Sequence, residues 1–158
     1  MIEIYTDGSC KKNPGPGGWG LIIIDTDTNE VKAYGCQYNH TTNNRMELRA
    51  LLVALRRAAD LCDYRVNIFS DSAYCVNMCN GWIFGWAQNG WSTKDKKPVK
   101  NLDLVKAIYQ FLAGFPNFTI TQIKGHTGIV GNELADAMAT NNIERFTKIC
   151  KQNNLTII

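Results

Sequence analysis

Apolar and polar positions in this chain follow two periodicities, and each predicts a type of element. Ile2–Thr6 alternates apolar and polar residues with the period of two that is typical of a strand, and Asp7-Gly8 is expected to end it with turn chemistry. Similar β-prone runs follow, separated by Gly, Pro, Asn or Asp. Strands are therefore predicted at Ile2–Thr6, Trp19–Asp25, Val31–Tyr38, Val66–Phe69 and Phe118–Lys124.

Helical patterns occupy the stretches between and after these strands. Arg45–Leu61 is rich in Leu, Ala and Arg, contains no Gly or Pro, and follows two possible capping residues, Thr42 and Asn43. Further helices are predicted at Ser72–Asn80 with Gly81 as its stop, Asn101–Ala113 and Asn132–Asn142, with an additional short helix around Ile83–Ala87. The resulting order, β-β-β-α-β-α-α-β-α, predicts one α/β domain over residues 1–142. The tail, 143–158, has no clear pattern and is expected to be frayed or packed over an edge.

Composition fits a soluble globular domain. The chain has 158 residues, 45% of them apolar and 20% charged, which argues against disorder or a coiled coil. Its longest apolar runs, Leu21–Ile24 and Leu51–Leu55, are far shorter than the roughly 20 residues of a membrane span, and no leader pattern follows Met1. A cytoplasmic protein is expected, with its cysteines reduced. These are Cys10, Cys36, Cys62, Cys75, Cys79 and Cys150.

Positive charge is concentrated in one segment. The net charge is only +3, yet the stretch between Trp82 and Asn101 holds four lysines against one acid, Asp95. The lysines are Lys94, Lys96, Lys97 and Lys100. A basic, tryptophan-containing segment can bind nucleic acid. It can equally be a solvated hairpin over a Trp cluster, and a nuclear-localisation signal is a weaker alternative.

Three motif matches fail on their context. Gly15–Gly20 spells G-x-G-x-x-G, but it leads into a predicted strand, whereas the dinucleotide fingerprint opens a helix. Asp25–Asn29 resembles the start of a calcium loop, but Glu30 stands where glycine is required. Cys75 and Cys79 have helical spacing without a partner motif, so core positions are favoured over a zinc site.

Four acids occupy the ends of predicted elements or helix faces that otherwise carry apolar residues. Asp7 and Asp71 follow predicted strands, Glu47 shares a helix face with apolar residues, and Asp136 lies on the last predicted helix. Neighbouring buried carboxylates repel unless a cation neutralises them, and oxygen ligands select hard cations such as Mg²⁺. For any one of these acids alone, a helix-terminal or surface role is the simpler interpretation. Spacing by itself does not prove that the four converge.

Six short motifs occur in order between residue 2 and about residue 140. They are Tyr5-Thr-Asp7-Gly-Ser-Cys, Asn13-Pro-Gly-Pro-Gly-Gly-Trp-Gly, Thr41-Thr-Asn-Asn-Arg-Met-Glu47-Leu, Ser70-Asp71-Ser, Lys124-Gly-His126 and Asn132-Glu-Leu-Ala-Asp136. In order and spacing they resemble type 1 ribonuclease H, the bacterial-type ribonuclease HI. The resemblance implies a ribonuclease H-like fold, with a mixed five-stranded sheet flanked by helices, and a catalytic domain over residues 1–142.

The resemblance also implies an activity and its catalytic residues. The family hydrolyses the RNA strand of RNA–DNA hybrids internally and leaves 3′-hydroxyl and 5′-phosphate ends. By match, Asp7, Glu47, Asp71 and Asp136 would hold two Mg²⁺ ions, with Mn²⁺ as an alternative, and two-metal sites suit this in-line displacement. His126 matches a loop histidine that assists proton transfer or product release. A monomer is expected.

Substrate-binding residues follow from the same resemblance. Cys10, Asn13, Asn43 and Asn44 match the minor-groove surface and Thr42 matches a phosphate pocket, although the asparagines would also serve as ordinary helix caps. Trp82, Trp86, Trp91 and the four lysines match the basic protrusion. The sequence departs from the bacterial pattern at Ala73, Gly85 and Ala87–Asn89, which predicts weaker, less salt-sensitive hybrid binding.

Two alternatives to a ribonuclease remain open from the sequence. One is a DNA junction resolvase of the same fold. The other is a hybrid-binding module without catalysis, which would be expected to have lost at least one of the four acids.

Overall fold

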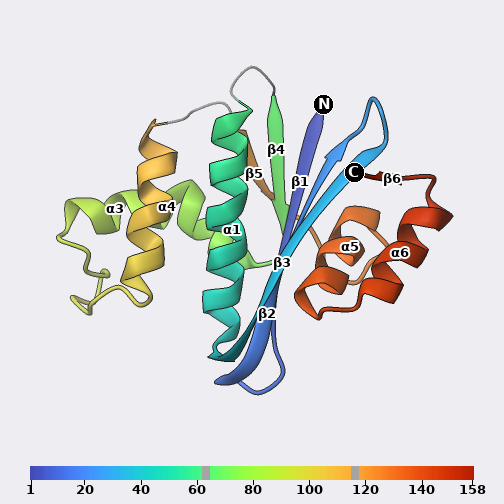
Figure 1. The fold of residues 1–158 in the computed structure, drawn as a ribbon. Coiled ribbons are helices and arrows are strands. Elements are labelled where there is room, and N and C mark those ends of the chain that lie inside the picture. Colours follow the sequence, from blue (N-terminus) through green and yellow to red (C-terminus); the bar gives the residue numbers. More distant parts are fainter. Residues whose placement is uncertain (62–64, 115–117) are drawn as a thin grey trace.

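A six-stranded mixed sheet forms the centre of the protein (Figure 1). The computed structural model describes residues 1–61, 65–114 and 118–158, and within them the strand order is β5-β4-β1-β2-β3-β6. β1 pairs antiparallel with β2 and parallel with β4, β2 with β3 is antiparallel, and β4–β5 and β3–β6 are parallel. The strands are β1 (Ile2–Cys10), β2 (Gly15–Asp25), β3 (Glu30–Thr41), β4 (Val66–Ser70), β5 (Phe118–Gln122) and β6 (Thr156–Ile157).

Helices cover both faces of this sheet. In Figure 1, α1, α3 and α4 lie to the left of the strands, and α5 and α6 lie to the right. The helices are α1 (Asn43–Asp60), α2 (Ala73–Asn77), the π-helical turn η1 (Met78–Trp82), α3 (Ile83–Gln88), α4 (Leu102–Gly114), α5 (Val130–Ala139) and α6 (Ile143–Gln152). None of the helices in the described part of the chain has both the length and the apolar character needed to cross a membrane.

Each face of the sheet has its own apolar core. The larger one packs α1 and α4 against the sheet through residues such as Ile4, Leu48 and Ile108, all fully buried. The smaller one packs α5 and α6 against the opposite face, around Ile22 and Leu134. Successive strand residues point to opposite faces, so Ile4 and Tyr5 of β1 join different cores.

The tail corrects the predicted strand count. The five predicted strands are all present, but Thr156–Ile157 adds a sixth by pairing in parallel with Glu30 and Val31. Before it, α6 begins at an Asn142 cap and buries Phe146, Ile149 and Cys150. These three positions have the i, i+3, i+4 spacing of an amphipathic helix. The tail therefore packs over an edge of the sheet and is not frayed.

Two predicted stops were wrong. β1 does not end at Asp7-Gly8, because its pairing with β2 continues through Cys10. Gly81 does not end a helix, because α2 continues through η1 directly into α3. The helix predicted at Asn132–Asn142 lies slightly earlier, at Val130–Ala139.

Strand β2 begins earlier than predicted, at Gly15 and not at Trp19, so Gly15–Gly20 is part of the strand and not a loop that leads into it. Other predictions of local structure are confirmed. Thr26–Asn29 forms the turn between β2 and β3, as expected for a hairpin. Cys75 and Cys79 are buried in the larger core, and burial raises the pKa of the Cys75 thiol to about 12. The five described cysteines are free, whereas Cys62 lies outside the described residues.

Candidate active site

Three of the four predicted acids meet beside the C-terminal end of β4, next to β1. Asp7 comes from β1, Glu47 from the first turns of α1, and Asp71 from the residue after β4. Each offers a carboxylate oxygen, and the three oxygens lie within 4.8 Å of one another. Asp7 and Glu47 are each only 6% exposed. The predicted convergence of these acids is therefore present in the fold.

Two glycines let helices approach the strands closely, one beneath α1 with Glu47 and the other beneath α5 with Asp136. A Cβ on Gly8 would lie 2.6 Å from the Met46 carbonyl carbon and 2.9 Å from the Glu47 Cα. On the other face, a Cβ on Gly20 would lie 2.7 Å from the Ala139 amide nitrogen. Real Cβ atoms do not approach backbone so closely, so α1 and α5 can sit at these distances only because both positions lack a side chain. Gly8 therefore serves helix packing and not the turn expected from the sequence.

Burial and mutual repulsion disfavour the charged forms of these acids. Burial, followed by the charge of Asp71 and contact with Asp136, raises the pKa of Asp7 to about 8, although the Gly8 amide donates to its Oδ1 at 2.9 Å and opposes the rise. Burial and the charges of Asp7 and Asp71 likewise raise the pKa of Glu47 well above its ordinary value. The cluster is therefore under electrostatic strain that a bound cation would relieve.

The donor set fits a hard divalent cation. Glu47 Oε2 is buried and has no hydrogen-bond partner, which is a costly arrangement for a carboxylate oxygen unless a ligand completes it. All three ligands are oxygens, the donor type that Mg²⁺ and Mn²⁺ prefer over softer metals. The residues present can therefore hold a divalent metal ion.

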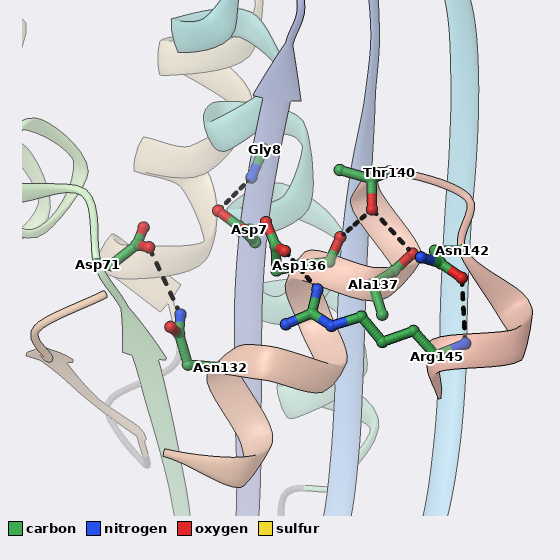
Figure 2. A network of polar contacts seen from close by, with 9 residues as sticks. All are labelled: Asp7, Gly8, Asp71, Asn132, Asp136, Ala137, Thr140, Asn142 and Arg145. Atoms are coloured by element: carbon green, nitrogen blue, oxygen red, sulfur yellow. Dashed lines mark hydrogen bonds and ion pairs between the residues drawn. The ribbon is translucent and has the colours of Figure 1, made fainter. Parts of the chain in front are cut away.

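Asp136 lies beside this cluster and has its own cationic partner (Figure 2). It projects from α5 toward Asp7, and its Oδ2 accepts a hydrogen bond from Arg145 Nη1 of α6 at 2.6 Å. The fourth predicted acid is thus adjacent to the other three, but it is already ion-paired. Arg145 was not among the residues expected from the sequence, because the tail had no predicted structure.

Two segments near Asp71 complete this side of the site. Asn132, buried at the start of α5, has its Nδ2 3.5 Å from Asp71 Oδ2 (Figure 2). A Cβ on Gly125 would lie 2.7 Å from the same Asp71 oxygen, so the loop after β5 runs directly against the cluster. His126 follows on that loop, exposed and in a left-handed backbone conformation with φ 56°. Asn132 was part of a recognised motif but was not predicted as a site residue.

The predicted minor-groove residues gather at the N-terminus of α1. Asn13 Oδ1 accepts from the Asn43 amide at 3.1 Å, and Thr42 caps α1 by accepting from the Arg45 amide at 3.2 Å. Cys10 is half-buried nearby, with its Sγ 3.6 Å from the Thr41 carbonyl oxygen. The hollow in front of them has a volume of about 530 Å³. It is lined by Asn13, Pro14, Thr42, Asn44, Lys100 and Asn101.

Asn101 is a further residue that the sequence did not identify. Its Oδ1 accepts from Arg45 Nη1 at 3.2 Å, and Arg45 is itself held by a bidentate ion pair with Asp103. That ion pair lowers the pKa of Asp103 to about 2. With its oxygen engaged, Asn101 has its Nδ2 available to donate to a ligand.

The basic segment between Trp82 and Asn101 contains α3, and its lysines lie exposed in the stretch after that helix. Trp82 is 47% exposed, and its ring lies 6.0 Å from that of Tyr74 and 6.2 Å from that of Trp86. Trp91 instead packs edge-on against Tyr109, 5.5 Å away. The four exposed lysines are Lys94, Lys96, Lys97 and Lys100. Of these, Lys100 is the one that reaches the hollow at the N-terminus of α1.

Comparison with known proteins agrees with this geometry. The RNase H family profile matches residues 1–144. Ribonuclease H of Rhizobium etli is 43% identical over 147 residues, covering 93% of this chain and 94% of that protein. LC9-RNase H1, a type 1 RNase H with the type 2 active-site motif, has a crystal structure that matches with a TM-score of 0.73 at 30% identity, covering 89% of this chain and 70% of that one. LC11-RNase H1, solved in complex with an RNA/DNA hybrid, matches with a TM-score of 0.66 at 26% identity, covering 92% and 98%. The chain belongs to the ribonuclease H family of nucleases.

Proposed function

We propose that this protein is an endonuclease that hydrolyses the RNA strand of RNA–DNA hybrids with two divalent metal ions, leaving 3′-hydroxyl and 5′-phosphate ends. The observation that carries the proposal is the cluster of Asp7, Glu47 and Asp71, in which the first two acids are buried and one carboxylate oxygen of Glu47 has no hydrogen-bond partner. Burying carboxylates without partners lowers the stability of the fold, and a bound metal ion would offset that loss.

The four acids would divide the metal-holding task. Asp7, Glu47 and Asp71 would hold one ion, and Asp136, next to Asp7, would help hold the second. Mg²⁺ is the proposed ion and Mn²⁺ the alternative. When bound, the ions would lower the pKa of the attacking water and stabilise charge on the leaving 3′ oxygen.

Other side chains of the site would act around this centre. Asn132 restrains Asp71, so that its carboxylate keeps its direction toward Asp7. His126 is proposed to carry protons to or from the reacting groups, since its exposed imidazole stands on the loop that borders Asp71. The carboxylates themselves remain ionised once their repulsion is neutralised.

Hybrid binding would use two surfaces: the residues at the N-terminus of α1 and the basic segment between Trp82 and Asn101. The amides of Asn13, Asn43 and Asn44 can both donate and accept, which suits the 2′-hydroxyls and base edges of a minor groove. Thr42, Lys100 and Asn101 line a hollow with the donors and the charge that a phosphate requires. Cys10 adjoins this surface, with its Sγ 3.6 Å from the carbonyl oxygen of Thr41, the residue before Thr42. The exposed Trp82, its neighbour Trp86 and the lysines Lys94, Lys96 and Lys97 would follow the DNA strand beyond it.

The proposed catalytic domain and the tail are joined in the fold. We assign catalysis to residues 1–142, with the tail 143–158 joined to them through α6. The enzyme is proposed to act as a monomer in the cytoplasm, where reducing conditions would preserve the five free thiols of the described chain.

A substrate panel tests the proposal. End-labelled RNA–DNA hybrid, double-stranded RNA and double-stranded DNA of one sequence are incubated with protein and Mg²⁺, and the chemical nature of the new ends is determined. Cleavage is expected in the RNA of the hybrid alone, with 5′-phosphate on the downstream fragment. Cutting of double-stranded DNA would instead indicate a resolvase-like nuclease, and hybrid binding without cutting would indicate a non-catalytic module.

A further inference from the structure

The contact between Arg145 and Asp136 joins the C-terminal helix to the acidic cluster. Its two atoms, Arg145 Nη1 and Asp136 Oδ2, are 2.6 Å apart, a short distance typical of a charge-assisted hydrogen bond. The side chains are only 35% and 23% exposed, so the pair is partly shielded from water. Among the described residues, no other arginine or lysine forms an ion pair with any of the four acids.

Arg145 is held firmly in this position. Its backbone amide donates to Asn142 Oδ1 at 3.0 Å, which caps the start of α6 (Figure 2). The Asn142 amide in turn donates to the Ala137 carbonyl at 2.7 Å, fixing α6 against the end of α5. Burial of Phe146 and Ile149 anchors the rest of the helix. The backbone of Arg145 is thus fixed at the turn into α6, at a place from which its side chain reaches Asp136.

The ion pair and a metal ion would compete for the same carboxylate. Asp136 contacts Asp7, and Asp7 belongs to the three-acid cluster with donors suited to a divalent cation. A guanidinium on Asp136 supplies one positive charge next to that cluster. It therefore reduces the repulsion among the acids when no metal is bound, and it opposes any further cation that approaches them.

We infer that Arg145 is a positioning residue that acts as a resident counter-ion: it holds Asp136 beside Asp7 in the metal-free protein and thereby weakens the binding of divalent cations by the four-acid cluster. The inference rests on the metal role given to Asp136 in the proposed function. Through Arg145, the tail would help to set the Mg²⁺ concentration at which the acidic cluster binds metal.

Calorimetric titration of the full chain with Mg²⁺ tests this inference. The variant Arg145→Met removes the charge and keeps most of the side-chain volume, and Lys148→Met removes one positive charge from an exposed position of the same helix. Arg145→Met is expected to bind Mg²⁺ about 5- to 10-fold more tightly than Lys148→Met, the range for a partly exposed, charge-assisted pair. Arg145→Lys should fall between Arg145→Met and the unaltered protein.

Two further measurements separate this inference from its alternatives. In EDTA, Arg145→Met should melt at a lower temperature than Lys148→Met, and saturating Mg²⁺ should narrow the difference. In an Asp136→Asn background, Arg145→Met should change Mg²⁺ affinity much less than it does in the unaltered protein, because the carboxylate for which the guanidinium and the metal compete is gone. Equal Mg²⁺ affinity of Arg145→Met and Lys148→Met would overturn the inference while leaving the proposed function intact. Failure of the unaltered protein to bind Mg²⁺ or cleave hybrid would instead overturn the proposed function.

Discussion

Replacing Gly8 with alanine should damage the active site through helix packing alone. Gly8 lies inside β1, next to Asp7, and α1 crosses it at backbone contact. The new Cβ would stand 2.6 Å from the Met46 carbonyl carbon and 2.9 Å from the Glu47 Cα, and would meet the Glu47 amide nitrogen more closely still. None of these atoms belongs to a flexible side chain that could turn away.

The size of the effect follows from these distances. Ordinary carbon contacts lie near about 3.5 Å, so α1 must move away from β1 by about 1 Å at this point. Glu47 would move with it, away from Asp7 and Asp71. A displacement of that size at a catalytic group costs about 100-fold in rate, and forcing an extra methyl into a packed contact costs about 1–3 kcal/mol of stability.

Hybrid cleavage at saturating Mg²⁺ and urea denaturation together measure both effects. Gly81→Ala is the matched control, because its Cβ would meet nothing within 4 Å and its position in η1 is helical. That variant should lose no stability and keep the catalytic constants of the parent apart from small changes in substrate affinity. A Gly8→Ala protein with parental stability and kcat/KM would refute the packing argument.

Three other predictions concern the charges of the site. In EDTA the melting temperature should fall as pH rises from about 4 to 8, because folded Asp7, with its pKa raised to about 8, keeps a proton that the unfolded chain releases near its ordinary value. The free energy of unfolding should fall by at most about 1.4 kcal/mol per pH unit for each proton that the folded protein retains. Glu47→Gln should make this pH dependence weaker, and a melting temperature that rises across this window would contradict the electrostatic account. His126→Ala should lower the cleavage rate constant measured in single-turnover assays about 100-fold with little change in hybrid affinity, and an unchanged single-turnover rate constant would exclude a proton-transfer role. Ala87→Lys combined with Asn89→Arg should steepen the log–log salt dependence of hybrid binding by roughly 0.9 for each additional phosphate that the protein neutralises, and an unchanged slope would place both residues away from the DNA strand.

The elements of the fold could be predicted where periodicity and burial agree. α1 matches its predicted span closely because apolar residues recur along one face and the capping Thr42 stands at its start. β1 was predicted too short, since Asp7-Gly8 has the chemistry of a turn. Its continuation through Cys10 depends on pairing with Gly17–Trp19, a Gly-rich stretch whose first residues were not predicted to be strand. α6 was missed although its apolar spacing and Asn142 cap were visible, because the short apolar stripe of Phe146, Ile149 and Cys150 is weak without knowledge of the face it covers.

That the acids converge could not be predicted from local sequence patterns. Asp7, Glu47 and Asp71 are separated by whole elements, and only the order β4-β1 with α1 packed across them brings their oxygens within 4.8 Å. The resemblance supplied that grouping. It supplied no information on Arg145, because the matched motifs end before α6, or on Asn101, whose orientation depends on a contact with Arg45 at long sequence separation.

The dependence of RNA cleavage on divalent metal and on Asp7 tests the central claim most directly. Protein stripped with EDTA is titrated with Mg²⁺ while cleavage of the labelled RNA strand in an RNA–DNA hybrid is followed, in parallel for the parent and Asp7→Asn. The parent should be inactive in EDTA and recover as Mg²⁺ is added, and Asp7→Asn should stay inactive at every concentration. Cleavage that persists in EDTA, or that survives in Asp7→Asn, would contradict the assignment of the acidic cluster as the catalytic metal site.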